Sequence, residues 1–284
     1  MNNKRAISSA IQITRLKQFA IWSELVKLRL TMMVLITTAM GFYLASVNTF
    51  DWLLLFHTLL GTGLLACGAA ALNQYLEKDF DAKMPRTTNR PIPAGHIRPE
   101  KALLAGGAMA AVGLVYLAMQ VNPITSVIGA VTLVSYVAVY TPLKRVTPLN
   151  TLVGTIPGAL PPLMGWTAAG GREAAIAPEG WSLVAILFFW QLPHFLAIAW
   201  IYRNDYEKAG FKMISIGTEA KKNTGRFAVI SCLALLPAAI SPYLMELAGV
   251  FYCGGAMVLT AYFIGLSWKF SRDMTLESAR WLFY

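Results

Sequence analysis

Residues 73–95 read NQYLEKDFDAKMPRTTNRPIPAG, and they directly follow an uncharged, mostly apolar run of about twenty residues. Within the stretch Asn73, Glu77 and Asp81 recur every four residues, so on a helix they share one face. Carboxylate and amide oxygens are the ligands that hard cations such as Mg²⁺ take in proteins. The spacing therefore predicts a magnesium-binding helix face at the mouth of a membrane helix.

Arg86, Thr87 and Arg90 follow the acidic face within a few residues. Guanidinium groups bind phosphate oxygens in a two-pronged geometry, so this segment combines metal ligands with phosphate ligands. A solvated helix end with ordinary charges is the alternative interpretation of the spacing alone. The added arginines favour a diphosphate that is bound through magnesium, and hence an enzyme.

Composition indicates a polytopic, all-α membrane protein in one domain, residues 1–284. The chain is 56% hydrophobic and 13% charged, which is more apolar surface than a water-soluble domain could bury. The formal charge of +10 does not indicate nucleic acid, because the charges cluster in short loops between apolar runs. A helical bundle is expected, since helices satisfy their own backbone groups in lipid.

Eight apolar runs are each long enough, or nearly so, to cross the bilayer as a helix. The chain then ends in RWLFY (280–284), which resembles the start of a ninth helix that is cut off. The alternative is a short frayed tail. The eight runs are Leu30–Val47, Leu53–Leu76, Leu103–Val121, Ile124–Tyr140, Leu149–Ala169, Trp181–Tyr202, Phe227–Leu247 and Val250–Trp268.

Basic residues predict the orientation of these helices. Of the 24 Lys and Arg residues, all except Arg172 fall in segments that alternate to one side of the membrane. By the positive-inside rule this side is cytoplasmic. We therefore expect a cytoplasmic basic N-terminal segment, residues 1–27, and site loops that face the cytoplasm.

The fifth apolar run is rich in helix-breaking and small residues. Prolines interrupt the backbone ladder, and a broken helix in lipid needs a cavity or partner for the freed backbone groups. A kinked packing helix and a pocket wall are equally compatible with the pattern. The residues concerned are Gly154, Pro157, Gly158, Pro161, Pro162 and Gly165.

Two further polar clusters fall on the same predicted side. Tyr140, Lys144 and Arg145 end the fourth run, where they are either interfacial anchors or, beside a diphosphate, phosphate ligands. His194 and Asp205 belong to the sixth run and the segment after it, eleven residues and about 16 Å apart on one helix face.

His194, which follows Gln191 and Pro193, is either a core residue or a ligand. Asp205 would lie level with the first cluster. Convergence of the second, fourth and sixth runs on one face is typical of a functional site.

These motifs resemble the UbiA superfamily of intramembrane prenyltransferases. That family has an N-x3-D-x3-D type motif, here Asn73, Glu77 and Asp81, and a Y-x3-K motif, here Tyr140 and Lys144. Its third, acidic motif is altered to YRNDY (202–206), which leaves Asp205 as the acid. This departure argues against a prenyltransferase that acts on a quinone precursor.

Residues 73–91, together with the PHF, AIAW and DYEKAG segments, are most similar to the protoheme IX farnesyltransferase branch of the superfamily. The resemblance implies nine membrane helices and transfer of farnesyl from farnesyl diphosphate to a vinyl group of haem b, with addition of water. It implies Mg²⁺ as the cofactor, a cell (inner or plasma) membrane location, and haem A synthase or terminal oxidase assembly factors as possible partners.

The resemblance also implies roles for the clustered residues. Asn73, Glu77, Asp81 and Asp205 would be catalytic metal ligands. Diphosphate would be held by Arg86, Arg90, Lys144, Arg145 and Tyr140, and haem would contact His194, Trp200 and Tyr206. The alternatives are a quinone-type prenyltransferase, a transporter, which should show inverted repeats, and a non-catalytic haem-binding protein.

Overall fold

The structure is a computed structural model that describes residues 17–46 and 49–283. Most of the predicted N-terminal segment, the end of the first predicted run at Val47, and Tyr284 lie outside the described residues. The described part is built from helices joined by turns and loops, in agreement with the all-α prediction.

Seven helices of the described part are long and apolar enough to cross a membrane. The fifth predicted run is absent from the seven because it is split in two. The spanning segments are Leu28–Ala45, Trp52–Asp81, Pro99–Gln120, Pro123–Leu143, Glu173–Ile201, Ala220–Leu244 and Val250–Asp273.

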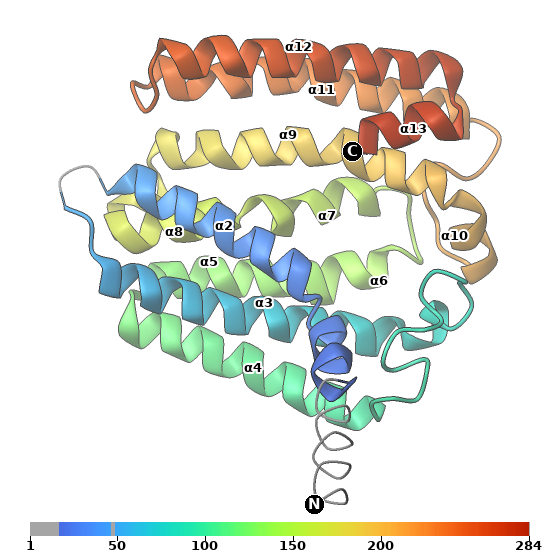
Figure 1. Ribbon diagram of the computed structural model, residues 1–284, viewed down its shortest axis with the longest axis horizontal. Helices are drawn as coiled ribbons and strands as arrows, with labels where there is room; N and C mark the ends of the chain where they lie inside the picture. Colours follow the sequence, from blue (N-terminus) through green and yellow to red (C-terminus); the bar gives the residue numbers. More distant parts are fainter. Residues whose placement is uncertain (1–16, 47–48, 284) are drawn as a thin grey trace, which may run out of the picture.

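The helices are labelled in Figure 1 and follow one another along the chain as a bundle of mostly antiparallel neighbours. The elements are α2 (Leu28–Ala45), α3 (Trp52–Asp81), α4 (Pro99–Gln120), α5 (Pro123–Val134), α6 (Thr141–Leu143), α7 (Asn150–Ala159), α8 (Pro161–Gly170), α9 (Pro178–Ile201), α10 (Arg203–Ala209), α11 (Ala220–Leu244), α12 (Val250–Asp273) and α13 (Leu276–Phe283). Two short helices of other types are the π-helix Ser135–Tyr140 and the 3₁₀ turn Glu173–Ala175.

Local sequence sets where the helices begin. The Asp51 side chain accepts a hydrogen bond from the Leu54 amide at the start of α3, at 2.9 Å. The Asn122 side chain caps α5 in the same way through the Thr125 amide, at 2.8 Å. Such caps satisfy amides that have no partner within the helix. Prolines occupy the first turns of α4, α5, α8 and α9, where their missing N–H costs nothing.

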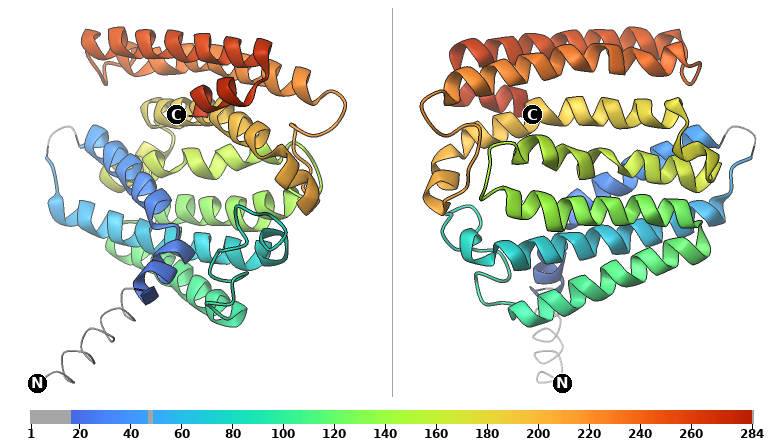
Figure 2. Two further views of the ribbon diagram at one scale, coloured as in Figure 1. Left: turned by 45° about the vertical axis from the view of Figure 1, so that its right-hand side comes forward. Right: turned by 180° about the vertical axis from the view of Figure 1, so that it is seen from behind.

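The helices pack as a stack in which α3 lies along α4 and α11 lies between α9 and α12 (Figure 1). α2 crosses the stack obliquely and packs on α8, and its oblique course is also visible in the view turned by 45° (Figure 2). This crossing is close because Gly41 of α2 and Gly165 of α8 have no side chains. A Cβ at Gly41 would run into the Pro162 carbonyl, and one at Gly165 would run into the Thr38 carbonyl.

The predicted run Leu149–Ala169 forms two ten-residue helices, α7 and α8, which break at Leu160. Pro161 and Pro162 follow the break, and neither can donate a backbone hydrogen bond to the preceding turn. The fourth predicted run is also irregular, because its last six residues, Ser135–Tyr140, form a π-helix. Such wide turns are frequent at functional sites.

One end of the bundle gathers the polar segments. The C-terminal end of α3, the loop 82–98, α6 and α10 lie together on the right-hand side of Figure 1. A buried cluster that includes Met84, Ala209 and Phe211, with Phe80 and Tyr206 packed against it, joins the loop to α10. The first two predicted clusters and the segment around Asp205 therefore meet at one end of the bundle.

Candidate active site

The acidic face at the end of α3 is buried. Asn73, Glu77 and Asp81 are 1%, 4% and 1% exposed, and all three belong to the last three turns of α3. The apolar run predicted to end at Leu76 thus continues as a helix to Asp81. Ionised groups at such a position need compensating charge, because burial of an unpaired carboxylate is costly.

Each carboxylate has a cation as its partner. Lys144 Nζ lies 2.7 Å from Glu77 Oε1, and Arg90 Nη1 lies 2.7 Å from Asp81 Oδ2. Both cationic side chains are themselves largely covered, at 15% and 20% exposure. Residues 67 and 9 positions away in sequence therefore neutralise the acidic face.

Asn73 is held in a similar way at its own end of the face. Lys27 Nζ donates to Asn73 Oδ1 at 2.7 Å, and the Asn73 amide nitrogen donates to Thr141 Oγ1 at 3.0 Å. Lys27 also donates to the Tyr136 hydroxyl at 3.3 Å. Three cations thus contact three oxygens that follow one another along α3.

The pKa values of the two lysines of this cluster, Lys27 and Lys144, are shifted in opposite directions. Burial of its ammonium, aided by the Arg90 guanidinium, lowers the pKa of Lys27 to about 7. Burial is the largest effect on Lys144 and would lower its pKa, but the Glu77 carboxylate and the Tyr140 and Tyr136 hydroxyls together outweigh burial and hold that pKa above its ordinary value. Lys144 is therefore a permanent positive charge at neutral pH.

The loop 82–98 is anchored to both the acidic face and α10. The Thr87 hydroxyl donates to the Asp81 carbonyl at 2.8 Å, which brings Arg90 back toward α3. Arg86 donates to the Tyr206 hydroxyl at 3.2 Å, and its guanidinium lies 4.6 Å from the centre of the Tyr202 ring. The altered third motif thus supplies two rings that hold Arg86.

Arg145 and Tyr140 connect the end of α6 to α3. Arg145 donates to the Leu76 carbonyl at 2.7 Å and lies 4.0 Å from the centre of the Phe80 ring. Its buried Nε makes no hydrogen bond among the described residues. The Lys144 ammonium lies 4.5 Å from the centre of the Tyr140 ring.

Asp205 is not brought into contact with the acidic face. It lies on α10, half-buried, and its side chain makes no ion pair with another described residue. Across residues 17–46 and 49–283, no three His, Cys, Asp or Glu side chains lie close enough to hold a metal ion by themselves. The Glu77 and Asp81 oxygens contact the positive side chains of Lys144 and Arg90. Carboxylate oxygens of this kind are also the ligands that hard metal ions take.

His194 and Trp200 pack away from these groups, against the C-terminal helices. The His194 ring is stacked between Trp190, at 5.5 Å, and Phe283 of α13, at 4.9 Å. Trp200 is 3% exposed, and its Nε1 donates to the Met274 carbonyl at 3.1 Å. Of the three residues predicted to contact haem, the structure brings only Tyr206 close to the polar cluster.

Three residues of the cluster, Lys27, Tyr136 and Thr141, were not predicted as site residues from the sequence. Lys27 counted only as one of the basic residues that set the orientation, and Tyr136 and Thr141 carried no motif of their own. The spacing of four between Tyr136, Tyr140 and Lys144 was a possible signal, because it places them on one side of a helix.

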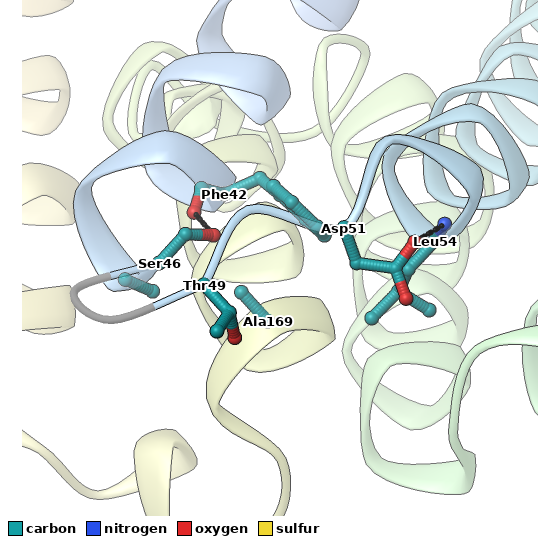
Figure 3. Close-up of a pocket in the computed structure, with 7 residues that line it drawn as sticks. Phe42, Ser46, Thr49, Asp51, Leu54 and Ala169 are labelled. Atoms are coloured by element: carbon teal, nitrogen blue, oxygen red, sulfur yellow. Dashed lines mark hydrogen bonds between the residues drawn. The ribbon is translucent and has the colours of Figure 1, made fainter.

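A pocket of about 500 Å³ lies at the opposite end of α2 and α3 (Figure 3). Its polar groups are bonded locally: Asp51 accepts from the Leu54 amide, and Ser46 donates to the Phe42 carbonyl at 2.8 Å. Along α3 this pocket is about 30 Å from Asn73 and about 45 Å from Asp81, at a rise of about 1.5 Å per residue. The lining residues are Phe42, Ala45, Ser46, Thr49, Asp51, Leu54 and Ala169.

Comparison with known sequences yields a consistent set of relatives. The chain is 41% identical to the protoheme IX farnesyltransferase of Solibacter usitatus over 266 residues, which is 90% of both chains. It is 42% identical to that of Myxococcus xanthus over 92% of this chain and 87% of the relative. The human mitochondrial enzyme of the same name is 39% identical over 93% of this chain and 58% of its own length.

Comparison with solved structures shows the same fold at low sequence identity. Digeranylgeranylglyceryl phosphate synthase superposes with a TM-score of 0.77 and 15% identity, over 94% of this chain and 92% of that one. A UbiA homologue from Archaeoglobus fulgidus, bound to DMAPP and Mg²⁺, superposes with a TM-score of 0.70 and 14% identity, over 92% and 98%. The model of the UbiA prenyltransferase family matches residues 34–284, and the chain therefore belongs to that family.

Proposed function

We propose that this protein transfers the farnesyl group of farnesyl diphosphate to a vinyl group of haem b with addition of water, giving haem O and diphosphate. Support comes from relatives near 40% identity that carry the name protoheme IX farnesyltransferase and match nine-tenths of the chain. The quinone-type and haem-carrier alternatives gain no support from these relatives.

The buried carboxylates of Glu77 and Asp81 are the main structural support for this chemistry. Glu77 and Asp81 are buried at the mouth of a membrane helix, and one oxygen of each carboxylate lies 2.7 Å from a cationic nitrogen. Such a site keeps both signs of charge in a setting of low dielectric, where each interaction is stronger than in water. It suits a ligand that brings a divalent cation and a polyanion together.

The donor set fits magnesium. Asn73, Glu77 and Asp81 present amide and carboxylate oxygens on one helix face, and we assign Asp205 as a fourth ligand, directly or through water. When bound, the metal would neutralise charge that develops on the diphosphate as the C1–O bond breaks. A relative of known structure is bound to DMAPP and Mg²⁺, which supports the assignment.

The basic residues would then exchange partners. Lys144 and Arg90 face the carboxylates, and a bound metal would free them to donate to diphosphate oxygens. We assign Arg86 and Arg145 to the rim of the same site, because they bracket α3 from the loop and from α6. Their donors would stabilise the leaving diphosphate.

Aromatic side chains close the inner side of the cluster. Tyr136 and Tyr140 are stacked at 5.8 Å, and the Lys144 ammonium lies between the Tyr140 ring and Phe211. Ring faces attract positive charge, so they suit an allylic cation as well as an ammonium. A site with few waters would also protect the cation from early capture. A haem contact by His194, Trp200 or Tyr206 stays a prediction.

The protein is integral to a membrane. We further propose one membrane-embedded domain in the cell (inner or plasma) membrane, with the acidic face toward the cytoplasm, on the distribution of Lys and Arg. Haem A synthase or oxidase assembly factors would be partners, because haem O is apolar and needs direct transfer to its next user.

A mass-spectrometric assay tests the function. Purified protein receives haem b, farnesyl diphosphate and Mg²⁺, and we expect a haem product that carries one farnesyl group and one hydroxyl group. EDTA should abolish its formation. A folded protein that binds haem b but yields no farnesylated product under these conditions would refute the proposal.

A further inference from the structure

Gln191 is a buried amide within a membrane helix. Its side chain lies in the middle of α9, is 7% exposed, and makes no hydrogen bond with any described residue. Some other buried polar groups of these helices donate within their own helix, as Thr38 does to Val34 and Ser231 to Phe227, whereas the Thr62 and Ser267 hydroxyls also lack a partner among the described residues. Burial of an amide without a hydrogen bond costs free energy. A glutamine at this position therefore indicates a ligand that supplies the missing hydrogen bonds.

The amide points at the proline-broken segment of α7. A Cβ at Gly158 would collide with Gln191 Oε1, so only glycine leaves room for the side chain here. The Gly158 carbonyl is also short of a partner. The residues three and four positions ahead are Pro161 and Pro162, which have no N–H to donate. A buried amide and a freed carbonyl therefore lie beside each other.

The position of this pair relates it to the acidic face. Gly154 lies one turn earlier on the same face of α7, and a Cβ there would be 2.5 Å from the Tyr140 ring. Tyr140 in turn lies under the ammonium of Lys144. Gln191 is thus about 6 Å deeper than Tyr140 along α7, on the membrane side of the group that would hold diphosphate.

We propose that the Gln191 amide and the Gly158 carbonyl hold the water molecule that adds to the haem side chain. The inference rests on the proposed function. A buried water needs two to four polar partners, and a glutamine amide supplies an acceptor and two donors while the carbonyl supplies an acceptor. Together they meet this requirement.

The C1–O bond of farnesyl diphosphate breaks and its electron pair leaves with the diphosphate. The vinyl π electrons form the new bond to C1, which leaves a cation on the vinyl carbon next to the porphyrin ring. The held water forms a C–O bond to this carbon, and its surplus proton passes to the released diphosphate. Gln191 orients the water and takes no proton, because an amide is not basic.

The test is the ratio of two products. Without an oriented water, the same cation loses a proton and gives a farnesylated haem that is lighter by one water molecule. In Gln191→Met we expect the ratio of hydrated to dehydrated product to fall about tenfold, the effect of one lost hydrogen bond. This ratio is a property of the product molecules, so it reports even if only part of the variant protein folds.

Two variants serve as controls. Gln191→Glu keeps an oxygen acceptor at the same length and should retain the hydrated product. Ser182→Ala, on the same helix, removes a hydroxyl that donates only to the Glu179 carbonyl at 2.6 Å and should leave the ratio unchanged. Assays in water enriched in oxygen-18 verify that the hydroxyl comes from solvent.

The outcomes separate the two proposals. If wild-type protein makes the hydrated product and Gln191→Met makes it in the same ratio, the role of Gln191 is refuted while the function stands. A uniform loss of turnover at a constant ratio has the same meaning, because it indicates a structural role. If wild-type protein makes no farnesylated haem, both proposals fail.

Discussion

Lys144 Nζ and Glu77 Oε1 lie 2.7 Å apart, although 67 residues separate them in the chain. The pair joins the end of α3 to the turn after the π-helix and places a permanent cation on the acidic face. Its counterpart, Arg90 with Asp81, spans nine residues and needs only one loop. The Lys144–Glu77 pair therefore depends on how separate helices pack, whereas the Arg90–Asp81 pair depends only on the loop between its residues.

Asp81→Asn should lower turnover by at least about a hundredfold while the protein stays folded, because the amide keeps the volume but removes a charged ligand. Turnover and thermal unfolding are measured in the same detergent. Asp79→Asn is the matched control, since Asp79 is 77% exposed on the other side of α3. Equal turnover in the two variants would contradict the metal role of Asp81.

Lys144→Met should raise the KM for farnesyl diphosphate about tenfold or more and leave the KM for haem b unchanged, because a charged donor to phosphate is lost. Steady-state kinetics with each substrate varied in turn measure the difference. Lys78→Met should change neither value, because the Lys78 ammonium lies at the same end of α3 but contacts Asp79, at 3.7 Å, and the Tyr75 ring, at 4.8 Å. Equal losses for both substrates would count against phosphate binding by Lys144.

Lys27 should make stability depend on pH above neutrality. Its pKa is about 7 in the folded protein and near the ordinary 10.5 when unfolded. Between these values the unfolded state binds a proton that the folded state lacks, so stability rises with pH through this window. We expect the unfolding temperature of wild type to rise between pH 7 and 9 relative to Lys27→Met. Lys17→Met, at an exposed position, should follow wild type.

Gly165→Ala should destabilise the protein by about 1–3 kcal/mol, since the new methyl group would collide with the Thr38 carbonyl where α8 crosses α2. Gly107→Ala is the control within a helix, because a Cβ at Gly107 meets no atom within 4 Å. That variant should be neutral or slightly more stable. Chemical or thermal unfolding of both variants measures the difference, and equal stability would show that α2 and α8 can separate without cost.

Much of the fold was predictable from hydropathy and charge. The predicted run Leu103–Val121 agrees closely with α4, Pro99–Gln120, because a lipid-facing helix is apolar along its whole length. The second apolar run ends at Leu76, but the spacing of Asn73, Glu77 and Asp81 predicted a helix that continues beyond it, and α3 does continue to Asp81. Hydropathy stops at the first charge, whereas the helix continues to Asp81 because cations from elsewhere neutralise its acidic turns.

The site was predictable only where its residues form motifs. Asn73, Glu77 and Asp81 share a face by spacing alone, and the structure places them together. Contacts such as Lys27 with Asn73 depend on how two helices cross, across 46 residues of chain, and no local pattern encodes that crossing. The break between α7 and α8 was visible as prolines, but the position of Gln191 against Gly158 was not.

The π-helix Ser135–Tyr140 sets the direction in which the residues after it point. Its wide turn, closed by the Thr141 amide on the Tyr136 carbonyl, accommodates one more residue than an α-helical turn of the same reach. If the same residues wound as an uninterrupted α-helix, every residue that follows would be rotated by about 100°. Lys144 would then face away from Glu77. The pairing of the two segments therefore depends on the winding of this helix as well as on the two side chains.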